Sequence, residues 1–202
     1  MKDIIEKNIL ERFLYAHKLK FSEIEKSLKI RLNKLNYHLQ KLIKKNILIK
    51  ERDFYKLSET SEYIIPYLSN KKHVLTVILI HIGNQDNAFL IKRNKRPYKD
   101  LLSLPGGRLI LGESIENATE RILEKFNVRA KFKEIKSISL EHLKKNGNVI
   151  ASYLLIYVTA KGEGIELTDI KKNKKKIIKS DYHLITSNFK KRISIEEINS
   201  AI

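Results

Sequence analysis

The stretch Leu104–Val128 constrains the fold more than any other part of this 202-residue chain. Its sequence, LPGGRLILGESIENATERILEKFNV, opens with a Leu-Pro-Gly-Gly loop that turns sharply out of a strand, because glycine accepts backbone conformations that other residues avoid. Ser114 then suits a helix N-cap, and apolar residues recur at helical spacing at Ile115, Ala118, Ile122 and Phe126. The pattern predicts a glycine loop that leads into an amphipathic helix, whose opposite face carries Glu116, Glu120 and Glu124.

This loop and helix resemble the Nudix box, Gly-x5-Glu-x7-Arg-Glu-aliphatic-x-Glu-Glu-x-Gly-aliphatic. Gly107 and Glu113 match its first two fixed positions. In that family the helix glutamates hold a divalent cation, Mg²⁺ or Mn²⁺, which prefers oxygen ligands and bridges a diphosphate. The resemblance implies an α+β chain whose second part is a Nudix-type α/β/α sandwich with a mixed sheet.

The second half of the motif departs from the family. Read without a gap, Arg121 is the motif arginine, but the three glutamate positions hold Ile122, Lys125 and Phe126. Read with one residue deleted, those positions hold Arg121, Glu124 and Lys125. Both registers place Lys125 where a metal-binding carboxylate belongs, so we expect a Nudix fold with a degenerate catalytic helix.

The resemblance still supplies candidate residues for catalysis and for a metal. The candidate catalytic carboxylates are Glu113, Glu120 and Glu124, and the candidate metal ligands are Glu120, Glu124 and Glu141. Glu120 and Glu124 are four residues apart and share a helical face, although any exposed helix face has the same pattern. Glu141 is a strand residue for which a solvent-facing position is the alternative.

A basic cluster precedes the glycine loop, at Arg93, Lys95, Arg96 and Lys99. It is either a clamp for the phosphates of a ligand or a solvated loop. If it is a clamp, we expect the ligand-binding residues to be Arg93, Arg96, Gly106, Gly107, Arg121 and Lys125.

Composition divides the chain into two parts. All seven glycines follow residue 82, which predicts a helical domain over 1–70 and a strand-and-loop domain over 73–202. The net charge is +18, with 15 basic and 9 acidic side chains in residues 1–70 and 26 and 14 in residues 71–202. This excess favours a polyanionic partner such as nucleic acid or a phosphorylated ligand. A general lysine bias of the sequence is the alternative.

The first domain has the periodicity of three helices, at 4–17, 22–28 and 32–45, followed by short strands at 47–50 and 54–57 and a last helix from Ser58 to about Leu68. We expect Ser22 to cap the second helix with Glu25, and Asn46 to end the third in a left-handed conformation. At residues 36–39 and 46–48 the sequence resembles the recognition helix and wing of ArsR- and MarR-like regulators.

That resemblance implies a winged helix-turn-helix that binds double-stranded DNA as a homodimer, with the third helix in the major groove. The implied DNA-binding residues are Asn33, Lys34, Asn36, Tyr37 and Lys41 on the helix and Arg52 on the wing. We expect Leu32, Leu35, Leu39 and Leu42 to face the core, and His38 to be packed. A winged helix used for protein contacts is the alternative.

The second domain changes to strand periodicity. Residues 73–82 predict a buried strand with a hairpin partner at 88–92, and residues 131–143 and 149–160 predict strands joined by an Asn-Gly turn. The lysine run 171–179 predicts a solvated loop, and residues 194–202 predict a closing helix.

The sequence leaves three functions open. The first is a DNA-binding transcriptional regulator whose Nudix-like domain senses a nucleoside-diphosphate or sugar-phosphate ligand with little or no hydrolysis. The alternative is an active Mg²⁺-dependent Nudix hydrolase of nucleoside diphosphate derivatives with an accessory winged helix. The third is a purely structural or RNA-binding adaptor, and the sequence shows no aromatic-rich signature of RNA binding. The chain has no cysteine, which excludes disulfides and thiolate zinc sites but leaves the compartment open. Without a signal peptide or an apolar run that could span a bilayer, we expect a cytoplasmic protein with no membrane partner.

Overall fold

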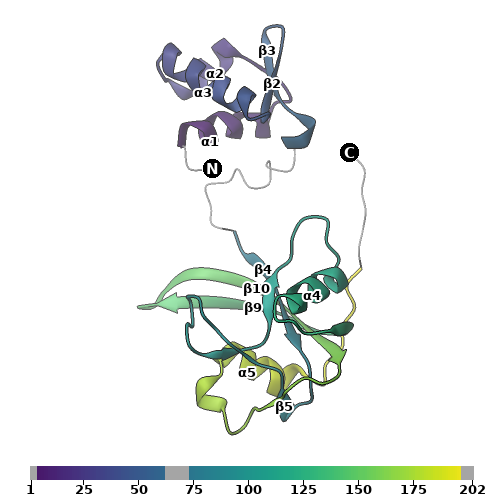
Figure 1. Ribbon diagram of the computed structural model, residues 1–202. Helices are drawn as coiled ribbons and strands as arrows, with labels where there is room; N and C mark the ends of the chain where they lie inside the picture. Colours follow the sequence, from purple (N-terminus) through teal and green to yellow (C-terminus); the bar gives the residue numbers. More distant parts are fainter. Residues whose placement is uncertain (1–3, 62–72, 197–202) are drawn as a thin grey trace. The chain divides into compact units, whose positions relative to one another are not determined.

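The computed structural model describes residues 4–61 and 73–196, and the chain divides into two compact units, Met1–Lys72 and His73–Ile202 (Figure 1). We call them unit 1 and unit 2. Within the described ranges, no helix is long and apolar enough to cross a membrane.

Unit 1 consists of short helices and a small antiparallel sheet of order β1-β3-β2. The elements are α1 (Ile4–Glu11), η1 (Arg12–Leu14), β1 (Leu19–Lys20), α2 (Phe21–Leu28), α3 (Leu32–Lys44), β2 (Leu48–Glu51) and β3 (Phe54–Leu57). Apolar side chains from all three α-helices and from the sheet form one core, which includes Ile9, Leu10, Ile24, Leu35, Leu39, Leu42 and Leu48.

Three predictions for unit 1 are wrong in detail. The first α-helix ends at Glu11 instead of His17 and continues as a 3-10 turn. The second helix begins at Phe21, where the Glu23 carboxylate accepts the Lys20 amide at 2.6 Å, so Ser22 and Glu25 do not cap it. Leu32 is 55 % exposed because it is the first residue of α3 and lies outside the core. The predicted helix 58–68 falls largely on residues outside the described ranges.

The turns of unit 1 follow from its sequence. Asn46 is in the left-handed region at φ 54°, which confirms the predicted end of the third helix. Arg52, also at φ 54°, occupies the two-residue turn between β2 and β3, at the tip of the hairpin.

A buried carboxylate joins α1 to α3. Glu6 is only 1 % exposed, and its oxygens lie 2.6 Å from Lys41 Nζ and 2.8 Å from Lys45 Nζ. Burial alone would raise the pKa of Glu6, but hydrogen bonds from the two lysines outweigh that effect and hold the pKa below its usual value. Lys41, expected to face DNA, is therefore engaged by Glu6. His38 is packed as expected, with 6 % of its surface exposed.

Unit 2 is built on a four-stranded mixed sheet of order β8-β4-β10-β9, in which β4 and β10 are parallel and the other pairs antiparallel. The elements are β4 (Leu75–His81), β5 (Asn87–Ala88), β6 (Ile91–Lys92), β7 (Leu102–Ser103), β8 (Gly106–Arg108), α4 (Ile115–Glu124), β9 (Ala130–Lys145), β10 (Asn148–Gly162), β11 (Thr168–Asp169), η3 (Lys174–Lys176), α5 (Lys179–His183) and η4 (Leu184–Asn188).

Alternate residues of the central strands feed two separate cores, because successive side chains of a strand point to opposite faces. Ile78 and Ile80 pack with Ile122 of α4, whereas Leu79 packs with Leu184 and Ile185 of the C-terminal helical segment. The sheet of unit 2 is therefore covered by helices on both faces, with α4 and α5 visible on either side of it in Figure 1.

The predicted hairpin 73–82/88–92 forms only at its turn, where Gly83 and Ala88 form an antiparallel bridge and the Phe89 amide donates to Ile82 O at 2.9 Å. β4 is flanked in the sheet by β8 and β10, while β5 pairs with β11 and β6 pairs with β7. The Asn-Gly hairpin is confirmed: Asn146 and Gly147 have φ of 51° and 80° and connect β9 to β10. The lysine run is partly ordered, since Ile177 and Ile178 are buried and η3 and α5 begin within it. Residues 194–196 are not helical, and the remainder of the predicted closing helix lies outside the described ranges.

Candidate ligand-binding site

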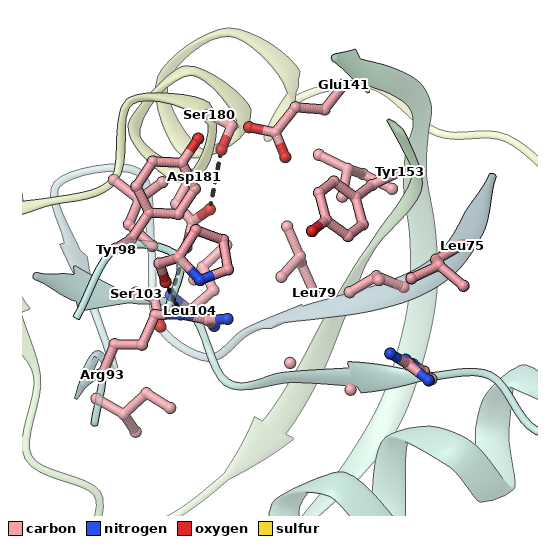
Figure 2. Close-up of a pocket in the computed structure, with 18 of the residues that line it drawn as sticks. Leu75, Leu79, Arg93, Tyr98, Ser103, Leu104, Glu141, Tyr153, Ser180 and Asp181 are labelled. Carbon is pink, nitrogen blue, oxygen red and sulfur yellow. Dashed lines mark hydrogen bonds between the residues drawn. The ribbon is translucent and has the colours of Figure 1, made fainter. Parts of the chain in front are cut away.

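Unit 2 contains a cavity of about 290 Å³ on the face of the sheet that carries Leu79 and Leu155. Its lining comes from the central strands, from the loop between β6 and β7, from the glycine loop at β8 and from the start of α5 (Figure 2). Four residues of the predicted ligand site, Arg93, Arg96, Gly106 and Gly107, lie together in this lining.

Three arginines give the cavity its positive charge. Arg93 and Arg96 come from the loop between β6 and β7, and Arg108 comes from β8. The loop is closed by backbone hydrogen bonds between Arg93 and its far side, including Arg93 N to Leu101 O at 2.8 Å. Arg93 Nε also donates to Pro97 O at 2.7 Å, which fixes its side chain, whereas Arg96 and Arg108 are exposed.

The two glycines of the loop are required by close packing. A Cβ on Gly106 would lie 2.7 Å from Leu79 Cδ2, and a Cβ on Gly107 would lie 2.8 Å from Ile122 Cγ1. Only glycine lets β8 approach β4 on one side and α4 on the other at these distances. Because β8 is held so close, the backbone of Gly106 and Gly107 forms part of the cavity wall.

The most buried part of the cavity lining is Ser103, Leu104 and Asp181, which we call the cavity floor (Figure 2). Asp181 Oδ2 accepts the Leu104 amide at 2.8 Å, and Ser180 Oγ donates to Oδ1 at 3.4 Å. Burial raises the pKa of Asp181 to about 7, with a contribution from the nearby charge of Glu141. A carboxyl group that stays protonated near neutral pH can donate a hydrogen bond.

The sequence analysis did not identify two residues of the cavity floor, Asp181 and Ser103, or the third cavity arginine, Arg108. Asp181 lies just after the lysine run, and no local pattern marks it. Ser103 precedes the glycine loop directly, so the turn itself was its only signal. Arg108 could have been found, because it follows Gly107 at the edge of the same loop.

Among the other residues of unit 2 predicted for catalysis, metal or ligand binding, Glu141 lies in the cavity lining, whereas Glu113, Glu120, Arg121, Glu124 and Lys125 lie outside it. Glu113 and Arg121 form a two-point ion pair, with Arg121 Nη2 2.7 Å from Glu113 Oε2. Arg121 Nη2 also donates to Arg108 O at 2.9 Å. The hydrogen bonds from Arg121 lower the pKa of Glu113, although burial opposes this. The pair therefore fastens the 108–113 loop to α4.

The carboxylates of unit 2 do not gather into a metal site. In the parts of the chain that the structure describes, no three His, Cys, Asp or Glu side chains form a group that could hold a metal ion. Glu120, Glu124 and Lys125 are exposed on or beside α4, while Glu141 lines the cavity. These residues do not fit the three-carboxylate Mg²⁺ or Mn²⁺ site that the Nudix box implies.

The end of α4 helps to choose the motif register. Asn127 has a φ of 56°, the left-handed conformation for which glycine is the common choice. In the register with one residue deleted, Asn127 stands at the motif glycine. That register keeps Glu124 at a ligand position and places Arg121 and Lys125 at the other two.

No protein-family model matches the chain, and no curated protein matches it. Among solved structures, it is similar to a Nudix hydrolase from Nitrosomonas europaea, with a TM-score of 0.51 and 15 % identity over 64 % of this chain and 98 % of that one. It is also similar to a MutT Nudix hydrolase from Burkholderia pseudomallei (TM-score 0.47, 14 % identity, 58 % and 98 % covered) and to a MutT protein from Methanosarcina mazei Go1 (0.46, 17 %, 60 % and 96 %). The mixed sheet of unit 2, with helices on both faces, has the Nudix fold.

Proposed function

We propose that unit 2 binds a phosphorylated small molecule of the nucleoside-diphosphate type, with its phosphates at Arg93, Arg96 and Arg108. The convergence of these three arginines on one cavity carries the proposal. A guanidinium group donates two parallel hydrogen bonds to phosphate oxygens and remains charged at every physiological pH. The cavity volume of about 290 Å³ is near the lower end of the range for small-molecule sites.

We further propose that the bound diphosphate is cleaved slowly or not at all. Glu113 is engaged by Arg121, and Lys125 provides a cation at a position where the Nudix box has a metal-binding carboxylate. Lys125 lies outside the cavity lining, so phosphate binding by the cavity arginines does not depend on a metal ion at that position.

A Nudix hydrolase is the second candidate, and the fold comparison favours it over a DNA-binding regulator. The solved structures named above are hydrolases or MutT proteins, and unit 2 shares their fold. In this reading Glu120, Glu124 and Glu141 would supply oxygen ligands for Mg²⁺ or Mn²⁺ despite their separation in the structure.

A turnover assay decides between these two functions of unit 2. The full chain is incubated with ADP-ribose, NADH and dinucleoside polyphosphates in Mg²⁺ or Mn²⁺, and the released mononucleotides are separated and quantified. We expect no turnover in the wild type and partial recovery in Lys125→Glu, with Lys131→Ala as a matched control for a lysine away from the motif. Turnover near 1 per second, an ordinary enzyme rate, together with its loss in Glu124→Gln, would establish the hydrolase.

For unit 1 we propose a DNA-binding winged helix-turn-helix. The order of its elements, with a two-stranded hairpin after the third helix, supports this proposal. The buried side of α3 carries Leu35, Leu39 and Leu42, and the exposed side carries Asn33, Lys34, Asn36 and Tyr37. With Arg52 at the hairpin tip, these side chains form a surface that can contact bases and phosphates.

The DNA proposal is tested by selecting binding sites from random duplexes with the full chain and measuring affinity at several salt concentrations. Lys34→Ala and Arg52→Ala should each reduce the salt slope by roughly 1, whereas Asn36→Ala should change base preference by about 1–3 kcal/mol at one position. Lys145→Ala, in the unit 2 hairpin, is the control. If DNA binding is unaltered in all three variants, the proposal that unit 1 is a DNA-binding winged helix-turn-helix is wrong.

A further inference from the structure

The cavity floor contains a buried hydroxyl group without a partner. Ser103 is 2 % exposed, and its Oγ makes no hydrogen bond to any residue that the structure describes. Because most buried polar groups in proteins are hydrogen-bonded, an unpaired one requires an explanation. Ser103 lines the cavity (Figure 2), and although its Oγ is closed off from water, rotation about the Cα–Cβ bond can turn the hydroxyl toward a ligand there.

Asp181 lies beside this hydroxyl and is 3 % exposed. The hydrogen bond from the Leu104 amide to its Oδ2 holds the carboxyl next to the β7 strand end that carries Ser103. Among the residues that the structure describes, its Oδ1 has only the 3.4 Å contact with Ser180, so it retains hydrogen-bonding capacity. The charged and titratable groups near Asp181 are Glu141 on β9, Arg93 and Tyr98 in the loop between β6 and β7, and Tyr157 on β10.

The surroundings of these two polar groups are apolar. Leu79 and Leu155 from the sheet and Ile178 from the segment before α5 line the same cavity. By contrast, the exposed Arg96 and Arg108 stand at its rim. An anionic group is therefore best placed at the rim, and an uncharged polar group is best placed at the floor, where its hydrogen bonds are shielded from water.

We propose that Ser103 and Asp181 form a specificity subsite for an uncharged ligand group that carries a hydrogen-bond donor beside an acceptor. A hydroxyl and a carboxylic acid can each donate and accept, so together they complement such a pair. The edge of a nucleobase and a pair of sugar hydroxyls both have this chemistry. The inference rests on the proposed binding of a nucleoside-diphosphate-type ligand. It adds that Ser103 and Asp181 recognise the part of that ligand that is not phosphate.

The test is calorimetry of the full chain with probes that separate these two sources and the phosphates. The affinity for inorganic pyrophosphate measures binding to the arginines at the cavity rim alone. ADP, GDP, CDP and UDP vary the base, and ribose 5-phosphate offers sugar hydroxyls without a base. The variants are Ser103→Ala and Asp181→Asn, and Ser152→Ala is the control, since it lies on β10 away from the cavity lining.

We expect at least one nucleotide or the sugar phosphate to bind at least tenfold more tightly than pyrophosphate. Ser103→Ala should weaken that probe roughly three- to tenfold, the range for loss of one neutral hydrogen bond, and leave pyrophosphate affinity unchanged. Thermal unfolding identifies any variant that fails to fold. If Asp181→Asn does not fold, the comparison of Ser103→Ala with the wild type still tests the subsite.

The outcomes separate the subsite from the proposed function. If pyrophosphate binds but every other probe binds equally tightly and is indifferent to Ser103→Ala, the subsite is wrong and phosphate binding stands. If pyrophosphate does not bind, but a nucleotide or the sugar phosphate binds and Ser103→Ala weakens that probe, the subsite stands and the phosphate site is wrong. If no probe binds, both are overturned.

Discussion

At the scale of single residues, Ser103 shows how a binding position can oppose stability. Its buried hydroxyl has no partner among the described residues, so folding removes it from water without compensation. Ser103→Ala should therefore raise the free energy of unfolding by about 1 kcal/mol, measured by urea denaturation without ligand. Ser152→Ala, which breaks the 2.8 Å contact between Ser152 Oγ and His142 Nδ1, should not be stabilising. A destabilised Ser103→Ala would show that the hydroxyl has a partner in the folded protein.

Asp181 should give the protein a specific pH dependence. Its pKa rises from 3.8 to about 7 on burial, so between these values the folded protein holds a proton that the unfolded chain has lost. The contribution of Asp181 to the free energy of unfolding therefore falls as the pH rises from about 4 to about 7. Asp181→Asn should be more stable than wild type at pH 8, by on the order of 4 kcal/mol, and the difference should vanish near pH 4. Urea denaturation across this range measures it, and a difference independent of pH would contradict the assignment.

At the residue scale, the sequence could indicate side chains that a local pattern brings together, and their role in ligand binding stays a prediction. Arg93 and Arg96 cluster beside a glycine loop in the chain, and the structure places both in the cavity lining. Asp181 reaches the same cavity from 77 residues beyond its partner Leu104, and only the assembled fold brings them together. Burial raises the pKa of Asp181 and leaves the Ser103 hydroxyl without a partner among the described residues. Which residues are buried depends on tertiary packing, which local sequence patterns do not reveal.

At the scale of elements, the Glu113–Arg121 pair connects the glycine loop to α4. The side chains are 10 % and 28 % exposed, so the two-point ion pair is partly shielded from water. A double-mutant cycle with Glu113→Gln and Arg121→Gln should give a coupling energy of about 1 kcal/mol, measured by urea denaturation. Arg129→Ala, on the exposed segment after α4, serves as the control. A coupling near zero would mean that the pair does not fasten the loop.

Elements with a strong local signal were predicted well. The Ser114 cap is confirmed, since its side chain accepts the Asn117 amide at 3.1 Å, and α4 runs over the predicted segment. The predicted hairpin partner of β4 is confirmed only at the turn after the strand, because the sheet neighbours β8 and β10 are distant in the sequence and strand pairing is a non-local choice. Residues 88 and 89 meet Gly83 and Ile82 at this turn, and the other pairings of segment 88–92 are with β7 and β11.

At the scale of the whole molecule, both units carry an excess of positive charge, +6 over residues 1–70 and +12 over residues 71–202. The composition indicated anionic partners but could not distinguish nucleic acid from a small ligand. In unit 2, three arginines line one cavity, which is the basis for proposing a small phosphorylated ligand. In unit 1 the exposed face of α3 remains the basis for proposing DNA.

The central claim is that the arginines of the unit 2 cavity bind a diphosphate ligand. Titration calorimetry with ADP-ribose tests it most directly, on the wild-type chain, on Arg96→Ala and Arg108→Ala, and on Arg129→Ala as an arginine outside this cavity. We predict that each cavity variant weakens binding about tenfold, equivalent to about 1.4 kcal/mol, while Arg129→Ala binds as the wild type does. Equal affinity in all four proteins, or no binding in any of them, would contradict the claim.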